Sequence, residues 1–240
     1  MRSHTAFTLV ELLVVMSIIV VLLAVTGPVV RGIMGGRNVT GGLEAISGYL
    51  AYARAQAVAQ NTYVVVGFYQ TIGTDDLQVA SVISTSGTFN PASFYPPTPT
   101  GAAANYQALG KTIHAGNVTL VPRTSLGTQL QDKLPAVSAD AVAECSNWPT
   151  YPSSNLGFFS FRSDTKPFKY CFLAFSSQGE AIFFSSAPAS TTSISANLPF
   201  YSQLLIGLRA TRGGSLVPSD ADTAALTLDG GSGDIKTYRP

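Results

Sequence analysis

The sequence has few charged residues, few histidines and few cysteines, and each shortage excludes a class of protein. Charged residues make up only 11% of the 240 residues, whereas typical soluble domains contain about 25%. The net charge of +1, from 14 Lys and Arg against 13 Asp and Glu, excludes a strongly basic nucleic-acid binder and also an acidic or disordered polyelectrolyte. Two histidines and two cysteines cannot build a zinc finger without carboxylate ligands.

No sequence motif indicates an enzyme. The glycine-rich turn at 230–233 lacks the strand–turn–helix context of a nucleophile elbow, and the sequence has neither a phosphate-binding loop nor a paired-carboxylate signature. His114, the one histidine after residue 4, is expected on the surface. We therefore predict that the protein is not an enzyme and that it has neither a cofactor nor a metal.

Four aspartates near the end of the sequence are candidate ligands for a metal site. They are Asp220, Asp222, Asp229 and Asp234. Hard oxygen ligands in a flexible loop can hold Ca²⁺, but the spacing is not that of an EF-hand. Solvated turn aspartates are the favoured interpretation.

The longest apolar run covers residues 7–30 and contains a single charge, Glu11. As a helix it spans ~36 Å, enough to cross a hydrocarbon core of ~30 Å. No small-residue cleavage site follows the run, so a membrane anchor is favoured over a cleaved secretion signal. A carboxylate in such a span costs up to ~2.5–3.5 kcal/mol, which marks Glu11 as a functional candidate.

Residues 6–15, AFTLVELLVV, resemble the prepilin processing site of type IV pilins and type II secretion pseudopilins. The resemblance implies that residues 1–6 form a leader and that prepilin peptidase cuts between Ala6 and Phe7. It also implies that Phe7 is then N-methylated and that Glu11 directs assembly. Ala6 departs from the family, which usually has glycine here, the smallest side chain and the one that the peptidase favours.

The same resemblance implies a location and a set of partners. It places the protein in the inner membrane with a single span and with its C-terminal domain in the periplasm or outside the cell. The partners are other pilin or pseudopilin subunits, the prepilin peptidase and membrane lipid. Pro28 matches a proline that commonly interrupts this helix in the family.

Beyond Pro28 the pattern remains helical and becomes amphipathic. Residues at spacings of three and four form one apolar stripe: Leu43, Ile46, Leu50, Ala53 and Ala57. We expect the helix to cover residues 7–62 and to stop near Asn61. Two glycine pairs predict a kink or a melted stretch between residues 27 and 42, because each glycine costs ~1 kcal/mol relative to alanine.

The rest of the chain, residues 63–240, is expected to be a β-rich domain with a loop-rich insertion at 85–156. The insertion is expected to hold a short strand at 117–121 and a short helix at 136–143. The other expected strands cover residues 62–69, 77–84, 158–162, 168–175, 181–185, 201–209, 225–228 and 235–238. The predicted fold class is α+β, with the long helix packed on an antiparallel sheet or sandwich.

Residues 46–69 add a narrower resemblance, to the minor pseudopilin H and FimT-like group, while the overall pattern also resembles prepilin-type cassette proteins of Verrucomicrobia. Both assignments stay open. The leading function is a structural minor pilin or pseudopilin subunit in a type II secretion or type IV pilus-like filament. The alternative is a module at a pilus tip that binds DNA during uptake. It requires one patch formed by Arg209, Arg212, Lys236 and Arg239. Scattered surface charge is favoured, so nucleic acid is not an expected partner.

The two cysteines, Cys145 and Cys171, are expected to form a disulfide if the domain lies in an oxidising compartment. Such a bond would close about 25 residues and add ~3 kcal/mol by the loop-entropy argument. Two unpaired thiols are the alternative.

Overall fold

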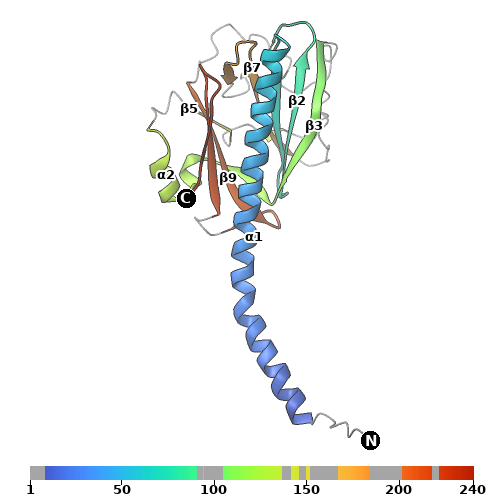
Figure 1. The fold of residues 1–240 in the computed structure, drawn as a ribbon, viewed down its shortest axis with the longest axis vertical. Helices are drawn as coiled ribbons and strands as arrows, with labels where there is room; N and C mark the ends of the chain where they lie inside the picture. The colour runs from blue at the N-terminus through green and yellow to red at the C-terminus, as the bar shows by residue number, and fades with distance from the viewer. Residues whose placement is uncertain are drawn as a thin grey trace, which may run out of the picture.

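The computed structural model describes residues 9–90, 94, 105–136, 142–145, 150–151, 167–183, 202–217 and 222–240, with the backbone alone at 21–38, 142–143 and 150–151. Within these residues one long helix lies against two β-sheets (Figure 1). The first half of this helix, α1 (Leu9–Ala59), extends away from the domain, and its second half lies on the sheets. The α and β content agrees with the predicted α+β class.

Asn61 fixes the end of α1 by adopting a left-handed backbone conformation, with φ of +48°. The N–H of Thr62 donates to the carbonyl of Ala57 at 3.0 Å, and the N–H of Asn61 donates to the carbonyl of Val58 at 3.2 Å. This pair of bonds is the Schellman arrangement, which satisfies the last carbonyls of a helix. Asn61 therefore stops the helix as predicted, and α1 ends at Ala59 instead of residue 62.

α1 continues through Pro28 and through both glycine pairs, so the melted stretch considered between residues 27 and 42 is not seen, and a kink stays a prediction. Gly42 is buried, and a β-carbon here would lie 3.4 Å from the side chains of Ala115 and Val118. The glycine that was expected to weaken the helix instead lets α1 lie close to its neighbours.

The first sheet has the strand order β3-β2-β1-β7-β6, with β8 also paired to β7. Its strands are β1 (Val64–Thr71), β2 (Asp76–Ser84), β3 (Tyr106–Gly116), β6 (Thr150–Tyr151), β7 (Phe168–Phe175) and β8 (Ala181–Phe183). All of its pairs are antiparallel. The middle strand, β1, is buried along its whole length, which explains its β-branched and aromatic sequence.

The second sheet has the order β10-β9-β11-β12, and β4 and β5 also pair with β9. Its strands are β4 (Val118–Val121), β5 (Val142–Glu144), β9 (Gln203–Arg212), β10 (Ser215–Leu216), β11 (Thr223–Asp229) and β12 (Ile235–Tyr238). Among the described strands, β5 departs from the expected antiparallel domain because it runs parallel to β9. A 3₁₀ turn, η3 (Arg123–Ser125), and the short helix α2 (Thr128–Lys133) follow β4.

The main core lies between α1 and the facing sides of the two sheets. Its helix side is the predicted apolar stripe, whose members are all fully buried: Leu43, Ile46, Leu50, Ala53 and Ala57. Full burial of one leucine or isoleucine stabilises a fold by roughly 1.5–3 kcal/mol. These side chains therefore attach the second half of α1 firmly to the domain.

Each sheet carries a further apolar cluster that is separate from the main core. The cluster on the first sheet is mostly aromatic and includes Phe94, Phe168, Tyr170 and Phe172. The cluster on the second sheet lies beside α2 and includes Leu126, Leu130, Leu134 and Leu205. Both sheets are therefore packed on two sides.

The segment 85–156 holds more regular structure than expected. Tyr106–Gly116 forms β3, an eleven-residue strand on the edge of the first sheet. A short helix is present at Thr128–Lys133, before the one expected at 136–143. Residues 137–141 lie outside the described residues, and Val142–Glu144 is strand β5 instead of helix. The strand expected at 158–162 lies outside the described residues. The other predicted strands are confirmed in position, with their ends shifted by up to three residues.

Candidate functional site

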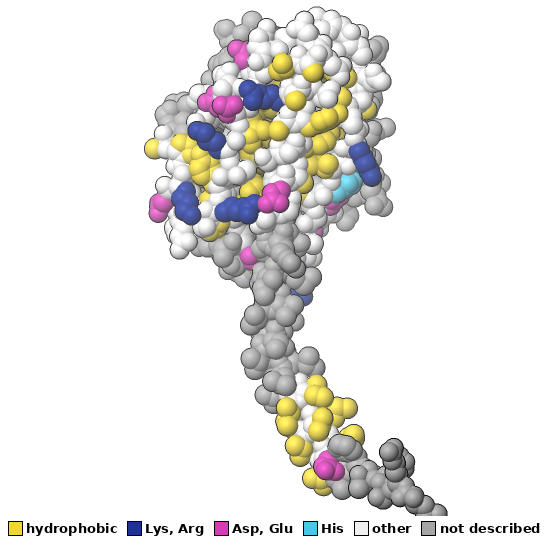
Figure 2. Space-filling model, viewed as in Figure 1, with side chains coloured by type: hydrophobic (Ala, Val, Ile, Leu, Met, Phe, Trp, Pro, Cys, Tyr) yellow, Lys and Arg dark blue, Asp and Glu magenta, His cyan; other side chains and the backbone are white. Residues whose placement is uncertain are grey.

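The first described turns of α1 expose apolar side chains. Ten large apolar residues between Leu9 and Val20 are exposed, and Figure 2 shows them gathered on the part of the helix that extends from the domain. Glu11, the expected assembly residue, lies exposed in the first turn of this segment. A contiguous apolar surface of this kind marks a contact with protein or lipid. Ala6 and Phe7, the expected scissile pair, lie outside the described residues.

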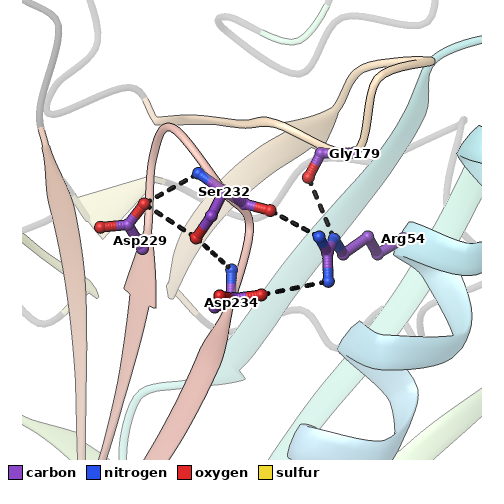
Figure 3. A network of polar contacts seen from close by, with 5 residues as sticks. All are labelled: Arg54, Gly179, Asp229, Ser232 and Asp234. Atoms are coloured by element: carbon purple, nitrogen blue, oxygen red, sulfur yellow. Dashed lines mark hydrogen bonds and ion pairs between the residues drawn. The ribbon is translucent and has the colours of Figure 1, made fainter.

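A single guanidinium joins the packed half of α1 to a hairpin turn of each sheet (Figure 3). Arg54 Nε donates to the carbonyl of Gly179, in the β7–β8 turn, at 3.1 Å. Arg54 Nη2 donates to the carbonyl of Ser232, in the β11–β12 turn, at 2.6 Å, and Nη1 lies 3.4 Å from Oδ1 of Asp234. We call this set of contacts the Arg54 junction. It fixes the position of the helix relative to both sheets.

The β11–β12 turn is held in shape by its own side chains. Oδ1 of Asp229 accepts hydrogen bonds from the N–H of Ser232 at 2.8 Å and from the Ser232 hydroxyl at 3.0 Å. The Ser232 hydroxyl oxygen accepts a further bond from the N–H of Asp234 at 3.1 Å. The bond from the Ser232 N–H lowers the pKa of Asp229 below its ordinary value. Asp229 therefore stays ionised at neutral pH and orients the carbonyl that Arg54 contacts.

The glycines of these two turns allow the close approach. Gly179 and Gly233 have φ of +83° and +70°, a backbone conformation that residues other than glycine rarely adopt. A β-carbon on Gly233 would collide with the carbonyl of Gly179 and would lie 2.9 Å from Arg54 Nε. This junction was not predicted from the sequence. The available signal was a pair of glycine-bearing hairpin turns that follow strands of different sheets.

The aspartates considered as calcium ligands have other surroundings. Asp234 belongs to the Arg54 junction, and Asp229 accepts hydrogen bonds from Ser232 in the same turn. Asp222 is buried in the domain, and Asp220 lies outside the described residues. Over the described ranges, no three His, Cys, Asp or Glu side chains gather as metal ligands would. His114 is exposed on β3, as expected, and its Nδ1 lies 3.0 Å from Oδ2 of Asp76.

The four basic residues of the DNA hypothesis do not form one patch. Arg209 lies on the same face of β9 as Leu205, which belongs to the apolar cluster beside α2. Its Nη1 donates to the carbonyl of Ser125 at 3.1 Å. Lys236 lies opposite Thr227, which lies opposite Leu205, so it is on this face too.

The other two basic residues lie toward α1. Arg212 lies two residues after Ala210 of the main core, so the two share the face of β9 that is turned toward α1. Arg239 Nη2 lies 2.8 Å from Oε1 of Glu44 on α1. Figure 2 shows basic and acidic side chains interspersed over the visible face. The strand register therefore divides the set into two pairs on opposite faces of the second sheet.

The two cysteines are brought together by the fold. Cys145 follows β5 and Cys171 lies in β7, and their Sγ atoms are 3.0 Å apart as thiols. Both residues are almost completely buried, and burial raises the pKa of the Cys171 thiol. The disulfide stays a prediction, and this proximity favours it.

We expect Cys145 and Cys171 to be oxidised in protein exported to an oxidising compartment. The check is labelling with a thiol reagent in denaturant, with and without prior reduction. Neither residue should react before reduction, and both should react after it. A Cys145→Ala variant is the matched control, because its remaining Cys171 should react without reduction. Labelling of both cysteines in unreduced wild-type protein would contradict the prediction.

Comparison with known proteins bears on the N-terminal segment. Residues 1–27 match the family model described as the prokaryotic N-terminal methylation motif. The chain is type IV pilin-like at this end. No curated protein and no solved structure matches it. Within the part of the chain that the structure describes, no helix is both long and apolar enough to cross a membrane.

This match confirms the coarser part of the sequence prediction. It includes Ala6, Phe7 and Glu11, and it supports prepilin cleavage, methylation and assembly with other pilin-like subunits. The narrower resemblance to the pseudopilin H and FimT-like group has no match of its own and stays a prediction, as does the choice between a secretion system and a pilus.

Proposed function

We propose that the protein is a minor pilin or pseudopilin, a structural subunit of a type II secretion or type IV pilus-like filament. The observation that carries this proposal is the methylation motif at residues 1–27, which includes the exposed apolar segment of α1, Leu9–Val20. In the proposal, this segment first anchors the subunit in the inner membrane as a single span. It then packs against the same segment of neighbouring subunits in the filament.

The shape of the molecule supports the proposal. An exposed apolar helix costs free energy in water in proportion to its area, at roughly 25 cal/mol per Å², so Leu9–Val20 needs a covering of lipid or protein. The β domain packs on the other half of α1 and leaves this segment uncovered (Figure 1). A subunit of this form can keep its domain on the filament surface, in the periplasm or outside the cell, while the helix joins a common core.

The alternative, a DNA-binding module at a pilus tip, has less support. Binding of DNA draws most of its affinity from basic groups that contact phosphates together. Arg209 and Lys236 lie on one face of the second sheet, and Arg212 and Arg239 on the other. A duplex on one face could meet only two of the four.

The proposal is tested by the mass of the mature N-terminus. We expect protein extracted from membranes of cells with an active prepilin peptidase to begin at Phe7 and to carry one N-methyl group. Intact mass spectrometry and sequencing of the N-terminal peptide measure both.

A matched variant separates peptidase processing from other proteolysis. Ala6→Leu places a large side chain where the peptidase favours a small one, so this variant should retain Met1 and the leader. An intact Met1 in wild-type protein would contradict the proposal. So would cleavage of Ala6→Leu that equals the wild type.

A further inference from the structure

A pocket of about 290 Å³ lies where the two sheets meet, away from the features already described. It is bounded by the end of β1 and the β1–β2 turn of the first sheet, and by β4, β9 and β10 of the second. Its lining includes Gln70, Thr74, Thr119, Lys169, Thr211 and Leu216. This volume is at the lower end of the usual range for small-molecule sites.

The wall of the pocket is built by contacts between the sheets. Oε1 of Gln70, a buried residue, accepts hydrogen bonds from the Thr119 hydroxyl at 3.0 Å and from the N–H of Leu120 at 3.3 Å. The β1–β2 and β9–β10 turns also lie backbone to backbone, because a β-carbon on Gly214 would be 2.7 Å from the carbonyl oxygen of Gly73. The pocket is therefore preformed and does not depend on a single mobile loop.

Thr211 supplies an unused polar group. It lines the pocket and is only 6% exposed, and its hydroxyl has no hydrogen-bond partner among the described residues. Buried hydroxyls are normally paired, and leaving one unpaired costs free energy. A ligand with a hydroxyl group or a carboxylate at this position would satisfy it.

Other hydroxyls in the lining have already used their protons. Thr74 donates to the carbonyl of Thr71 at 2.9 Å, and Thr119 donates to Gln70. Their oxygen atoms keep lone pairs that can accept hydrogen bonds from a ligand. The pocket therefore favours a ligand that carries several hydroxyl donors.

Lys169 sets the preferred charge of the ligand. It is half-buried on β7 and lines the pocket, and the described residues give it no ion pair. Among the described residues, none that lines the pocket carries a carboxylate. Asp75 lies next to the wall, but its Oδ1 already accepts a bond from the N–H of Gly214 at 2.8 Å. An ammonium group facing a ligand makes its strongest hydrogen bonds to a carboxylate.

The rim of the pocket is apolar. Ile72, in the β1–β2 turn, is 45% exposed and Leu216, in β10, is 48% exposed, and both line the pocket. Their methyl groups can cover the C–H face of a small ring whose hydroxyls point inward. In the described lining, the combination of one cation, several acceptor oxygens and an apolar rim differs from a plain water-filled crevice.

We propose that this pocket binds a sugar acid, one hydroxylated ring that carries a carboxylate. Lys169 binds the carboxylate, Thr211 and its neighbouring hydroxyls bind the ring hydroxyls, and Ile72 and Leu216 cover the ring. The volume holds a single sugar unit, so the source is either a free sugar acid or the terminal unit of an acidic polysaccharide. The site does not depend on the function proposed above.

The test is a titration of the detergent-solubilised full-length chain, followed by saturation-transfer NMR. The probes are glucuronate, glucose as the neutral analogue and glucosamine as the cationic one. We expect glucuronate to bind about fivefold or more tightly than glucose, a difference of about 1 kcal/mol, and glucosamine not to bind. A trigalacturonate arm separates the sources, because tighter binding than the monomer indicates a polysaccharide end.

Matched variants localise the binding. Lys169→Met should reduce the affinity for glucuronate to that for glucose, and Thr211→Val should weaken it about fivefold. Lys111→Met, which removes an exposed lysine from β3, should change nothing. Thermal melting of each variant monitors folding, and Thr211→Val should melt at or above the wild-type temperature because it removes an unpaired buried hydroxyl.

Three results would overturn the proposal. They are absence of glucuronate binding, equal binding of the three sugars, and binding that both pocket variants leave unchanged. Preference for an acidic peptide, tri-glutamate, over every sugar would assign the pocket to a protein partner instead. If Lys169→Met does not fold, Lys169→Gln provides the same comparison.

Discussion

Replacing Gly233 with alanine is expected to lower the free energy of unfolding by about 3 kcal/mol. The residue has φ of +70°, a conformation that costs an alanine roughly 1–2 kcal/mol. The new β-carbon would also collide with the carbonyl of Gly179 and press on Arg54 Nε. Separation of the two turns would then weaken hydrogen bonds to a charged group, which contribute about 1.5–3 kcal/mol when well formed.

Gly87→Ala is the matched control for this prediction. Gly87 has the same φ of +70°, and a β-carbon there would have no atom within 4 Å. We expect it to cost about 1 kcal/mol, from backbone strain alone. Urea unfolding of the full-length variants, followed by circular dichroism, measures both values. Equal stability of the two variants would mean that the Arg54 junction tolerates the displacement.

Replacing Glu11 with glutamine is expected to reduce incorporation of the subunit into filaments about tenfold or more. In the proposed assembly, the carboxylate pairs with the methylated amino group of Phe7 on an adjoining subunit. Apolar packing between helices is non-directional, so this pair selects one axial register. The substitution keeps the size and hydrogen bonding of the side chain but removes its charge. A loss of about 1.4 kcal/mol corresponds to the tenfold effect.

Glu44→Gln is the matched control, because it makes the same chemical change on the packed half of α1. Glu44 is exposed and pairs with Arg239 of the same chain, so we expect this variant to assemble normally. Co-purification of each variant with filament partners measures the assembled fraction, and the total membrane fraction shows whether each variant still inserts. Wild-type assembly of Glu11→Gln would show that the carboxylate does not set the register.

The parts of the fold with strong local patterns could be predicted from the sequence. The members of the apolar stripe from Leu43 to Ala57 follow one another at about one helical turn, and every member is buried. The run Val64–Thr71 is buried on both faces, so its continuous β-branched and aromatic sequence identified it as a strand. Asn61 was recognisable as a helix stop because asparagine tolerates the left-handed conformation.

The missed elements have weak local patterns for physical reasons. β3, Tyr106–Gly116, is an edge strand that meets the main core through Leu109, Ile113 and Ala115, and the exposed Lys111 interrupts this face. The alternation of polar and apolar residues is therefore weak. β5, Val142–Glu144, is three residues long and is specified by its partner β9. Tertiary pairing, and not local propensity, determines such a strand.

The candidate sites also differ in whether they could be predicted from local sequence. The segment with Phe7 and Glu11 is contiguous in the sequence, so its chemistry could be recognised there. Arg54 reaches residues about 125 and 180 positions away, and no local pattern connects them. The pocket of Lys169 and Thr211 likewise exists only after the two sheets have met.

The Arg54 junction also has a consequence for biosynthesis. Arg54 Nη2 contacts a carbonyl 178 residues later in the chain, and Glu44 pairs with a residue 195 positions later. Contacts of such sequence separation slow folding, because the intervening chain must be ordered first. At a synthesis rate of roughly 5–20 residues per second, the ribosome needs on the order of ten seconds or more to supply these partners. During that interval the apolar stripe of α1 lacks the cover that β9 and β11 supply in the main core, and so nascent chains are most exposed to chaperones and proteases at this stage.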